Sequence, residues 1–592
     1  MNINKINYVQ KGISWIHEKL NEKQFLIFSS VLVGISAGMA AVLLKLLVHF
    51  IRQYIIEDKL LNLDFKYIYL LLPVIGIGLT VFIVQKFFKG KLYRGNVNIL
   101  HSIAKKGSFL PFEQMYSHII TSGLTVGFGG SAGLESPIVS TGAAIGSNYS
   151  KRYKLNYKDR TLLLAAGAAG GIAGAFNSPI AGVLFALEVV LVDINITAFI
   201  PLLIAAASGA LLSKIILNEN MLLYFRLKQP FNYYNVPFYI ILGLLAGVIS
   251  LYYVNFFDAV ETKFKKVKSN YGRWIIGGIL LVILIAFFPS LFGEGYDSIK
   301  SLSELKPELL FKNSIIGSYI NNPWTILLFI TGAMMLKAFA AGVTLGSGGN
   351  GGNFAPSLFV GAYLGFIFAF LLQLLGFKNI PVSNFTIVAM AGILSGVFHA
   401  PLTAIFLIAE ITGGYELIIP LMLVSSISYV VVKYFHPFSL DVKKLLKKGT
   451  IISDDKDTSI LGKIEIKSII ENDFSIIHPD DKLRSIVETI KHSKRNTFPV
   501  VSNTNKLLGI INLDHIKEEM FNQELYDKII AKELMYEALT KIKISDTIFQ
   551  VMKKFEESGE WNLPVVDNGI YVGFLSKSSI LTKYRNELVA SI

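Results

Sequence analysis

The chain has 592 residues, of which 52% are hydrophobic, with a mean hydropathy of +0.52 and a formal net charge of +14. This length excludes a single ordinary domain, and the composition is typical of membrane proteins. The chain has no cysteine, which excludes disulfides and thiolate metal sites.

Residues 1–23 are polar and basic, and no signal peptide is predicted, because the apolar run from Phe25 lacks a small-residue cleavage site. From 24 to 442 we expect a membrane domain, since a bilayer-spanning helix needs about 20 residues. Some of its apolar segments are long enough, and others are short or broken by Gly and Pro. The segments are Phe25–Val48, Ile68–Phe87, Leu162–Val192, Ala198–Leu212, Phe238–Val254, Trp274–Phe288, Trp324–Ala340, Leu358–Leu375, Thr386–Ile411 and Leu417–Val432.

Basic residues gather in the N-terminal tail, in the loops Gln85–Gly95 and Lys151–Arg160, and in the last third of the chain. Within the apolar region they flank its segments, which fits the positive-inside rule and a cytoplasmic N-terminus, rather than a nucleic-acid partner. The loop Lys263–Lys268 is also basic, but the sequence alone does not assign it to one side of the membrane.

The apolar region contains an internal duplication. The stretch Gly127–Gly146 (GFGGSAGLESPIVSTGAAIG) is echoed 219 residues later by NGGNFAPSLFVGAYLG, and NSPIAGVLFALE (Asn177–Glu188) is echoed by HAPLTAIFLIAE (His399–Glu410). Two matched blocks in the same order indicate a duplicated unit, with repeats at about 24–262 and 273–435.

Matched Gly- and Pro-interrupted segments predict a binding site at the repeat interface, where half-helix N-termini meet near the midplane. Pro137 and Pro356 suit a first helical turn, and helix N-termini attract anions without a buried cation. We therefore expect a small monovalent inorganic anion as substrate. Glu135 lies at such a start, where it can compete with the anion when ionised and move aside when protonated. The alternative is a carboxylate that only stabilises the helix dipole.

The character changes after His436, and 443–465 is predicted to be a linker. A second duplication covers 466–520 and 530–588, with Pro499 and Gly509 matched by Pro564 and Gly573. Each unit reads as strand, helix, strand, turn, strand, helix, and the pair resembles tandem CBS domains.

Members that bind adenine nucleotides usually have Ser or Thr three residues after the turn glycine and Asp six residues after it. The chain has Asn512 and His515 in one unit, and Ser576 and Ser579 in the other. We expect no required cofactor; both an adenine nucleotide and a ligand-free structural and dimerising role stay open.

The sequence GLESPIVSTGAAIG resembles the GxEGP signature of CLC chloride channels and chloride/proton antiporters, and GGNFAP resembles their GxFxP signature. The resemblance implies an all-α polytopic membrane domain built as an inverted repeat of broken helices, followed by an α/β tandem CBS module. It also implies a homodimer with one pore per subunit and Glu135 as the gating residue. The implied chloride-binding residues are Gly133, Leu134, Ser136, Asn353, Phe354 and Ala355.

The chain departs from the family pattern at four positions. Ser136 stands where the family usually has Gly, Arg94 at the chloride-coordinating Ser, and Asp441 at the pore Tyr. Arg94 and Asp441 are possible pore-lining residues that could pair as an inner gate; the alternative is that Arg94 belongs to a basic cytoplasmic loop. Val189 stands where antiporters of the family generally have an internal proton glutamate, and Glu188 and its equivalent Glu410 are expected to be structural.

Val189 favours passive, channel-like chloride conduction; a chloride/proton antiporter is the alternative, and a pore for fluoride or nitrate a remoter one. No P-loop, GxSxG elbow or HExxH motif is present, so neither an enzyme nor a metal site is predicted. A CBS-containing magnesium channel would carry its CBS pair before the membrane domain, whereas here the pair follows it, so this class of channel is not predicted. We expect a multi-pass protein of the cell (plasma or inner) membrane with both termini cytoplasmic, and with chloride, lipid and a second copy as partners.

Overall fold

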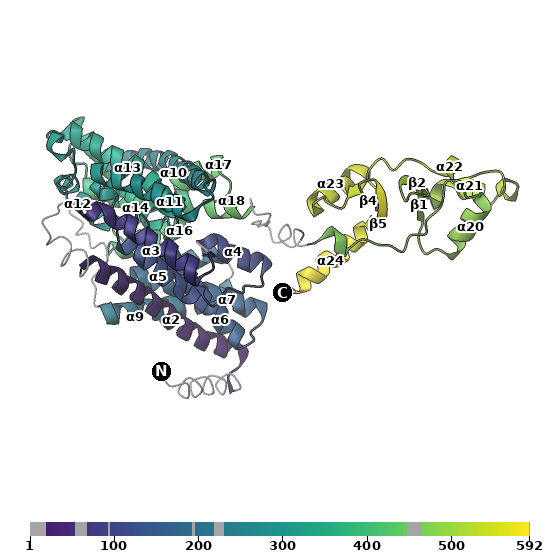
Figure 1. Ribbon diagram of the computed structural model, residues 1–592, viewed down its shortest axis with the longest axis horizontal. Coiled ribbons are helices and arrows are strands. Elements are labelled where there is room, and N and C mark those ends of the chain that lie inside the picture. Colours follow the sequence, from purple (N-terminus) through teal and green to yellow (C-terminus); the bar gives the residue numbers. More distant parts are fainter. Residues whose placement is uncertain are drawn as a thin grey trace. The chain divides into compact units, whose positions relative to one another are not determined.

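The computed structural model describes residues 19–53, 68–92, 95–191, 196–217, 230–446, 461 and 464–590. The chain divides into two compact units, Met1–Thr450 and Ile451–Ile592. The first unit is helical, and the second combines short helices with small sheets (Figure 1).

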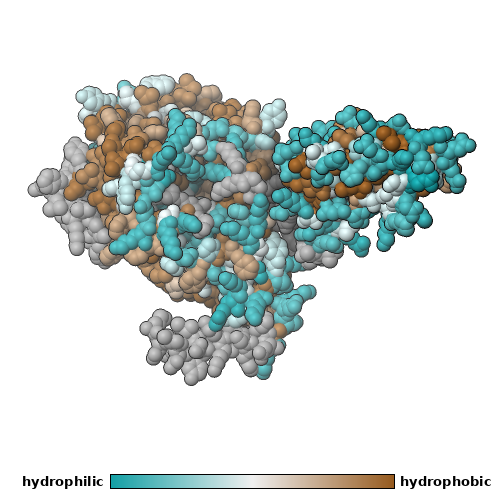
Figure 2. Space-filling view, turned by 45° about the vertical axis from the view of Figure 1, so that its right-hand side comes forward, coloured by the Kyte–Doolittle hydropathy of each residue, from teal (hydrophilic) through white to brown (hydrophobic). Residues whose placement is uncertain are grey.

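Eight helices of the described residues are long and apolar enough to cross a membrane. Figure 2 shows broad hydrophobic areas on the surface of the helical unit, whereas the C-terminal unit is mostly hydrophilic. Large apolar side chains such as Leu43, Val248 and Leu328 are exposed, as expected for a surface that faces lipid. The eight helices are α2 (Glu22–Phe50), α3 (Leu72–Phe87), α9 (Ile196–Leu217), α10 (Val236–Lys265), α11 (Asn270–Phe287), α13 (Pro323–Gly346), α14 (Phe354–Leu374) and α17 (Ile418–Phe435).

The other helices of this unit are shorter or less apolar, which is why hydropathy alone does not identify α4, α5, α6 or α12. They are α4 (Asn96–Lys105), α5 (Gln114–Gly127), α6 (Glu135–Arg152), α7 (Tyr157–Phe176), α8 (Pro179–Phe185), α12 (Tyr296–Ser303), α15 (Val382–Phe398), α16 (Pro401–Ile411) and α18 (Leu440–Leu446).

The duplication is visible in the packing. In the first repeat α2, α7 and α9 pack on one another, and α6 packs on α7; in the second, α10, α15 and α17 pack on one another, and α14 packs on α15. The purple-to-blue and teal-to-green helices accordingly form two groups (Figure 1). α8 and α16 meet where the repeats join.

Close packing within each repeat depends on small residues. A Cβ atom on Gly142 of α6 would lie 2.1 Å from the carbonyl oxygen of Gly167 in α7, and one on Gly167 would lie 2.0 Å from that of Gly142. Without a side chain at either position the two backbones approach directly, as is common between membrane helices.

Two of the predicted apolar segments, Leu162–Val192 and Thr386–Ile411, are each divided between two α-helices, α7 and α8 in the first and α15 and α16 in the second. The break falls at Asn177 in the first (φ 54°) and at His399 in the second (φ 57°), both left-handed. Pro179 and Pro401 then begin the next helices, α8 and α16. A left-handed residue ends a helix, and proline suits the first turn of a new one.

Glu188 and Glu410 cap each other's repeat. The Glu188 carboxylate accepts hydrogen bonds from the Leu402 amide (3.1 Å) and the Thr403 amide (2.7 Å) at the start of α16. Glu410 accepts from the Ile180 amide (3.1 Å) and the Ala181 amide (2.9 Å) at the start of α8. Each carboxylate thus satisfies helix N-terminal donors that have no partner within their own helix.

The C-terminal unit repeats a small pattern of its own. Strands β1 (Thr497–Val501) and β2 (Leu507–Asn512) pair antiparallel with Val500 opposite Gly509, and β4 (Asn562–Asp567) and β5 (Ile570–Ser576) pair with Val565 opposite Gly573. A register shift follows that pair in both sheets. β3 (Ile542–Lys543) adds a parallel strand to β4. The helices of this unit are α20 (Leu483–His492), α21 (Lys517–Met520), α22 (Ala531–Leu534), α23 (Ile548–Ser558) and α24 (Lys577–Ala590).

We expect Glu188→Ala and Glu410→Ala each to lower the thermal stability of the detergent-solubilised protein, because each leaves two amides at a helix start without acceptors. The loss is about 1–3 kcal/mol per site. Glu416→Ala is the matched control, since Glu416 is exposed in the loop before α17. Melting followed by tryptophan fluorescence measures the effect. Equal melting temperatures for Glu188→Ala and Glu416→Ala would contradict the capping role.

Candidate functional site

The two signature loops are joined by two backbone hydrogen bonds. The Gly133 amide donates to the Gly352 carbonyl (2.9 Å), and the Gly352 amide donates to the Gly133 carbonyl (2.8 Å). These residues are 219 positions apart, the offset of the duplication. The starts of α6 and α14, which follow the loops directly, therefore lie next to one another.

A second reciprocal pair anchors each loop to the other repeat. The Ser131 amide donates to Oγ1 of Thr344 in α13 (3.1 Å), and the Asn350 amide donates to Oγ1 of Thr125 in α5 (3.0 Å). Because these bonds use side-chain oxygens, the loop backbone is satisfied without regular secondary structure at membrane depth.

Glu135 is the first residue of α6 and is 3% exposed. Its Oε1 accepts a hydrogen bond from the Tyr296 hydroxyl (2.6 Å), and its Oε2 lies against Gly133 and faces the amide of Ala355. A Cβ atom on Gly133 would lie 2.0 Å from Oε2, so only glycine leaves room for the carboxylate in this position. The carboxylate therefore lies at the adjoining N-termini of α6 and α14.

The start of α14 is fixed by aromatic packing. Phe354 is buried, and its ring lies 5.6 Å from that of Phe176, 6.3 Å from Phe185 and 5.3 Å from Phe398. These contacts join the start of α14 to the ends of α7, α8 and α15. Ala355, the next residue, is fully buried.

The other residues that the sequence singles out around Glu135 lie at the same two helix starts. Leu134 is the N-cap of α6, and Asn353 is the N-cap of α14. Ser136 and Asn353 both line a cavity on one side of Glu135. The Gly133 amide already donates to Gly352, so its contribution is to position the loop.

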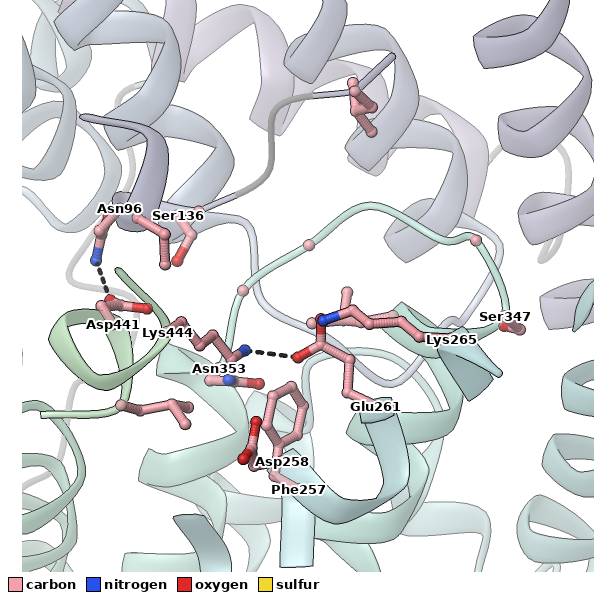
Figure 3. Close-up of a pocket in the computed structure, with 18 of the residues that line it drawn as sticks. Asn96, Ser136, Phe257, Asp258, Glu261, Lys265, Ser347, Asn353, Asp441 and Lys444 are labelled. Carbon is pink, nitrogen blue, oxygen red and sulfur yellow. Dashed lines mark hydrogen bonds and ion pairs between the residues drawn. The ribbon is translucent and has the colours of Figure 1, made fainter. Parts of the chain in front are cut away.

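This cavity, the Asp441 cavity, has a volume of about 640 Å³. Figure 3 shows Asn96, at the start of α4, pointing toward Asp441 in α18. The Asn96 side-chain amide donates to Asp441 Oδ2 (3.1 Å). Asp441 thus lines the cavity and accepts its hydrogen bond from Asn96. Arg94, the partner that the sequence suggested for Asp441, lies outside the described residues.

The cavity wall also carries charges of both signs. Glu261 in α10 forms ion pairs with Lys444 (2.5 Å) and Lys265 (2.9 Å), and Asp258 and Arg273 also line the cavity. The Glu261–Lys444 pair, visible in Figure 3, joins α18 to α10.

A second cavity of about 370 Å³, the Tyr296 cavity, lies on the other side of Glu135. Glu294 and Tyr296 line it, and an ion pair between Arg52 and Asp297 lies at its wall. The two cavities lie at opposite ends of α11: Asn270 and Arg273 at its start line the Asp441 cavity, and Pro289, just after its end, lines the Tyr296 cavity. An 18-residue helix is about 27 Å long.

Val189 lies in the π-helical segment Ala186–Leu191 and is 8% exposed. The neighbouring Glu188 carboxylate is bound to the amides at the start of α16. Neither residue lines the Asp441 cavity.

Sequence reasoning missed three residues here: Tyr296, Glu294 and Lys337. Tyr296 and Glu294 lie in and before a short polar helix that no repeat or apolar pattern marks. Lys337 did carry a signal, because it is a charge inside the apolar segment Trp324–Ala340.

In the C-terminal unit, the positions compared with nucleotide-binding CBS domains make internal contacts. Ser576 donates to Glu471 Oε1 (2.5 Å) and accepts from the Ser579 amide (3.0 Å). Asn512 accepts from the Asp514 amide (3.3 Å), and the ring of His515 lies 5.0 Å from that of Tyr536.

Comparison with known proteins gives the same two parts. Residues 76–433 match the family described as voltage gated chloride channel, and 466–522 and 531–586 each match the CBS domain. A putative chloride channel protein, ClcB-like, from Ralstonia nicotianae is 29% identical over 370 residues, which cover 61% of this chain and 81% of that protein.

Two solved structures share the fold. A slow cyanobacterial Cl⁻/H⁺ antiporter superposes with a TM-score of 0.62 and 22% identity, covering 72% of this chain and 98% of that one. A eukaryotic CLC transporter gives a TM-score of 0.60 and 18% identity over 94% of this chain and 97% of that one. The paired signature loops, the helical membrane unit and these matches lead to one conclusion: the chain belongs to the voltage-gated chloride channel (CLC) family of chloride-transport proteins, with a tandem CBS pair after its membrane unit.

Proposed function

We propose that this protein conducts chloride passively between the Asp441 and Tyr296 cavities through a pore gated by Glu135. The observation that carries the proposal is the position of the Glu135 carboxylate. It is buried at the adjoining starts of α6 and α14. The next residue, Ser136, lines one cavity, and Tyr296, which donates a hydrogen bond to Glu135, lines the other. An ion that crosses between the cavities must displace it.

Chloride binds, in this proposal, where the carboxylate lies. The amides at the helix starts supply partial positive charge, so the anion needs no lysine or arginine in contact with it. The proposed chloride-binding residues are Leu134, Ser136, Asn353, Phe354 and Ala355, with Gly133 positioning the loop.

Passive conduction is favoured because Val189 supplies no carboxylate at the internal proton position and Glu188 is held by two amides of α16. Chloride/proton antiport is the second candidate. Asp441 favours it, since this carboxylate lines a cavity beside Glu135 and could carry a proton in place of the missing glutamate. Selectivity for fluoride or nitrate is a remoter alternative, which anion substitution in the same assay tests.

The distribution of basic loops supports a cytoplasmic Asp441 cavity. Gln85, Gly90 and Leu92 of one basic loop line this cavity, and so does Lys265 of the loop whose side the sequence left open. The positive-inside rule then assigns this side to the cytoplasm, in the cell membrane. We further propose a homodimer with one pore per subunit, as family membership suggests; light scattering of the detergent-solubilised protein tests this state.

Replacing Glu135 by Ala removes the tethered carboxylate and leaves the helix starts open to chloride. We expect chloride efflux from proteoliposomes to rise roughly tenfold at neutral pH, the factor expected for one charge-assisted hydrogen bond of about 1.4 kcal/mol. Wild-type efflux should increase as pH falls, because protonation neutralises Glu135, and Glu135→Ala should lose this pH dependence. Glu416→Ala is the control, and an unchanged pH profile in Glu135→Ala would contradict the gating role.

Chloride efflux recorded together with proton flux separates the two transport modes. Passive conduction gives chloride efflux with no proton movement against its gradient, in the wild type and in Asp441→Asn alike. Uphill proton movement driven by chloride would overturn passive conduction. Loss of this uphill proton movement in Asp441→Asn, with chloride flux retained, would assign the internal proton site to Asp441.

We propose that the CBS pair is a structural and dimerising module that needs no nucleotide, which the internal contacts of Ser576 and Ser579 support. A ligand that binds only the native state raises the melting temperature. Melting of the full chain with millimolar AMP, ADP or ATP should therefore match melting without nucleotide. A dose-dependent increase that Ser576→Ala abolishes would contradict this.

A further inference from the structure

Lys337 is a fully buried lysine in the middle of α13 that the proposed chloride path does not use. Its Nζ donates hydrogen bonds to Ser131 Oγ (2.9 Å) and to the Gly293 carbonyl (3.0 Å), and lies 4.7 Å from the ring centre of Phe359. A charge inside a membrane domain is costly unless it has such partners, so these contacts fix its position.

The two acceptors of Lys337 belong to the two loops that meet at the gate. Ser131 lies four residues before Glu135, and Gly293 lies three residues before Tyr296. A backbone hydrogen bond from the Gly293 amide to the Gly129 carbonyl (2.9 Å) joins the same loops a second time. The separation between Glu135 and Tyr296 is therefore set by contacts that involve neither side chain.

We propose that Tyr296 is a positioning residue that holds ionised Glu135 in the chloride path, and that Lys337 joins the two loops that bring them together. The inference rests on the proposed gating by Glu135. The tyrosine hydroxyl is a neutral donor, and its hydrogen bond to a carboxylate is stronger than its bond to a protonated acid. It therefore favours the blocked pore, and protonation of Glu135 weakens the bond and releases the gate toward the Tyr296 cavity.

Several charged groups face this hydrogen bond and enter its pH dependence. Glu294, on the cavity wall two residues before Tyr296, repels the Glu135 carboxylate, and Lys45 and Arg52 of the α2 region and Lys337 of α13 attract Glu294. Asp297 is paired with Arg52. Since Tyr296→Phe leaves all five of these ionisable groups in place, a change in its pH profile reports the lost hydroxyl.

The test compares Tyr296→Phe with Tyr252→Phe in chloride efflux from proteoliposomes. The control also loses a tyrosine hydroxyl bound inside the membrane unit, since Tyr252 donates to the Met335 carbonyl (3.0 Å) away from both cavities. We expect Tyr296→Phe to raise efflux about tenfold at neutral pH. Its half-maximal efflux should move to a pH about one unit higher, because the ionised gate has lost its donor. Tyr252→Phe should match the wild type.

The same substitution in the Glu135→Ala background shows whether Tyr296 acts through the gate. We expect Tyr296→Phe to be silent there, and Lys337→Met to change efflux in the same direction as Tyr296→Phe when Glu135 is present. A wild-type pH profile in Tyr296→Phe would overturn the inference, and so would an equal increase without Glu135. The absence of chloride efflux from wild type and Glu135→Ala alike would instead overturn the proposed function.

Discussion

The two hydrogen bonds between Gly133 and Gly352 are the constraint on which the rest of the membrane unit depends. They join equivalent points of the two repeats, so the starts of α6 and α14 must adjoin. The Ser131–Thr344 and Asn350–Thr125 bonds extend the same reciprocity to α5 and α13. A loop at membrane depth must satisfy its backbone groups within the protein, and here each repeat supplies hydrogen-bond acceptors for the loop amides of the other.

The same reciprocity explains why chemically identical side chains have different roles. Glu188 and Glu410 each accept two amide hydrogen bonds from a helix of the opposite repeat, which fixes them as caps. Glu135 also lies at helix starts, but its Oε1 accepts from the neutral hydroxyl of Tyr296, at the edge of a cavity, while its Oε2 faces the Ala355 amide. The Glu135 carboxylate thus lies beside a cavity, whereas the two capping carboxylates line neither cavity.

The two cavities give Glu135 unlike surroundings on its two sides. On one side, Asp441 accepts a hydrogen bond from Asn96, and the cavity wall carries the Glu261 ion pairs. On the other, Glu294 and Tyr296 belong to a loop that Lys337 holds against the loop before Glu135. This asymmetry arises from residues outside the repeated blocks, so the two sides of a pseudosymmetric membrane unit differ in their chemistry.

The sequence by itself determined the duplication, the membrane unit, the CBS pair and the position of Glu135 at a helix start, because repeated small residues and hydropathy are local properties of the chain. It also assigned Glu188 and Glu410 to structure, which their hydrogen bonds confirm. Only the tertiary structure decided that Leu162–Val192 and Thr386–Ile411 each form two helices, and that Asp441 bonds to Asn96, 345 residues away. It alone brought Tyr296 to Glu135 and Lys337 to Ser131, because these contacts cross the repeat interface, where no local pattern in the sequence records the partner.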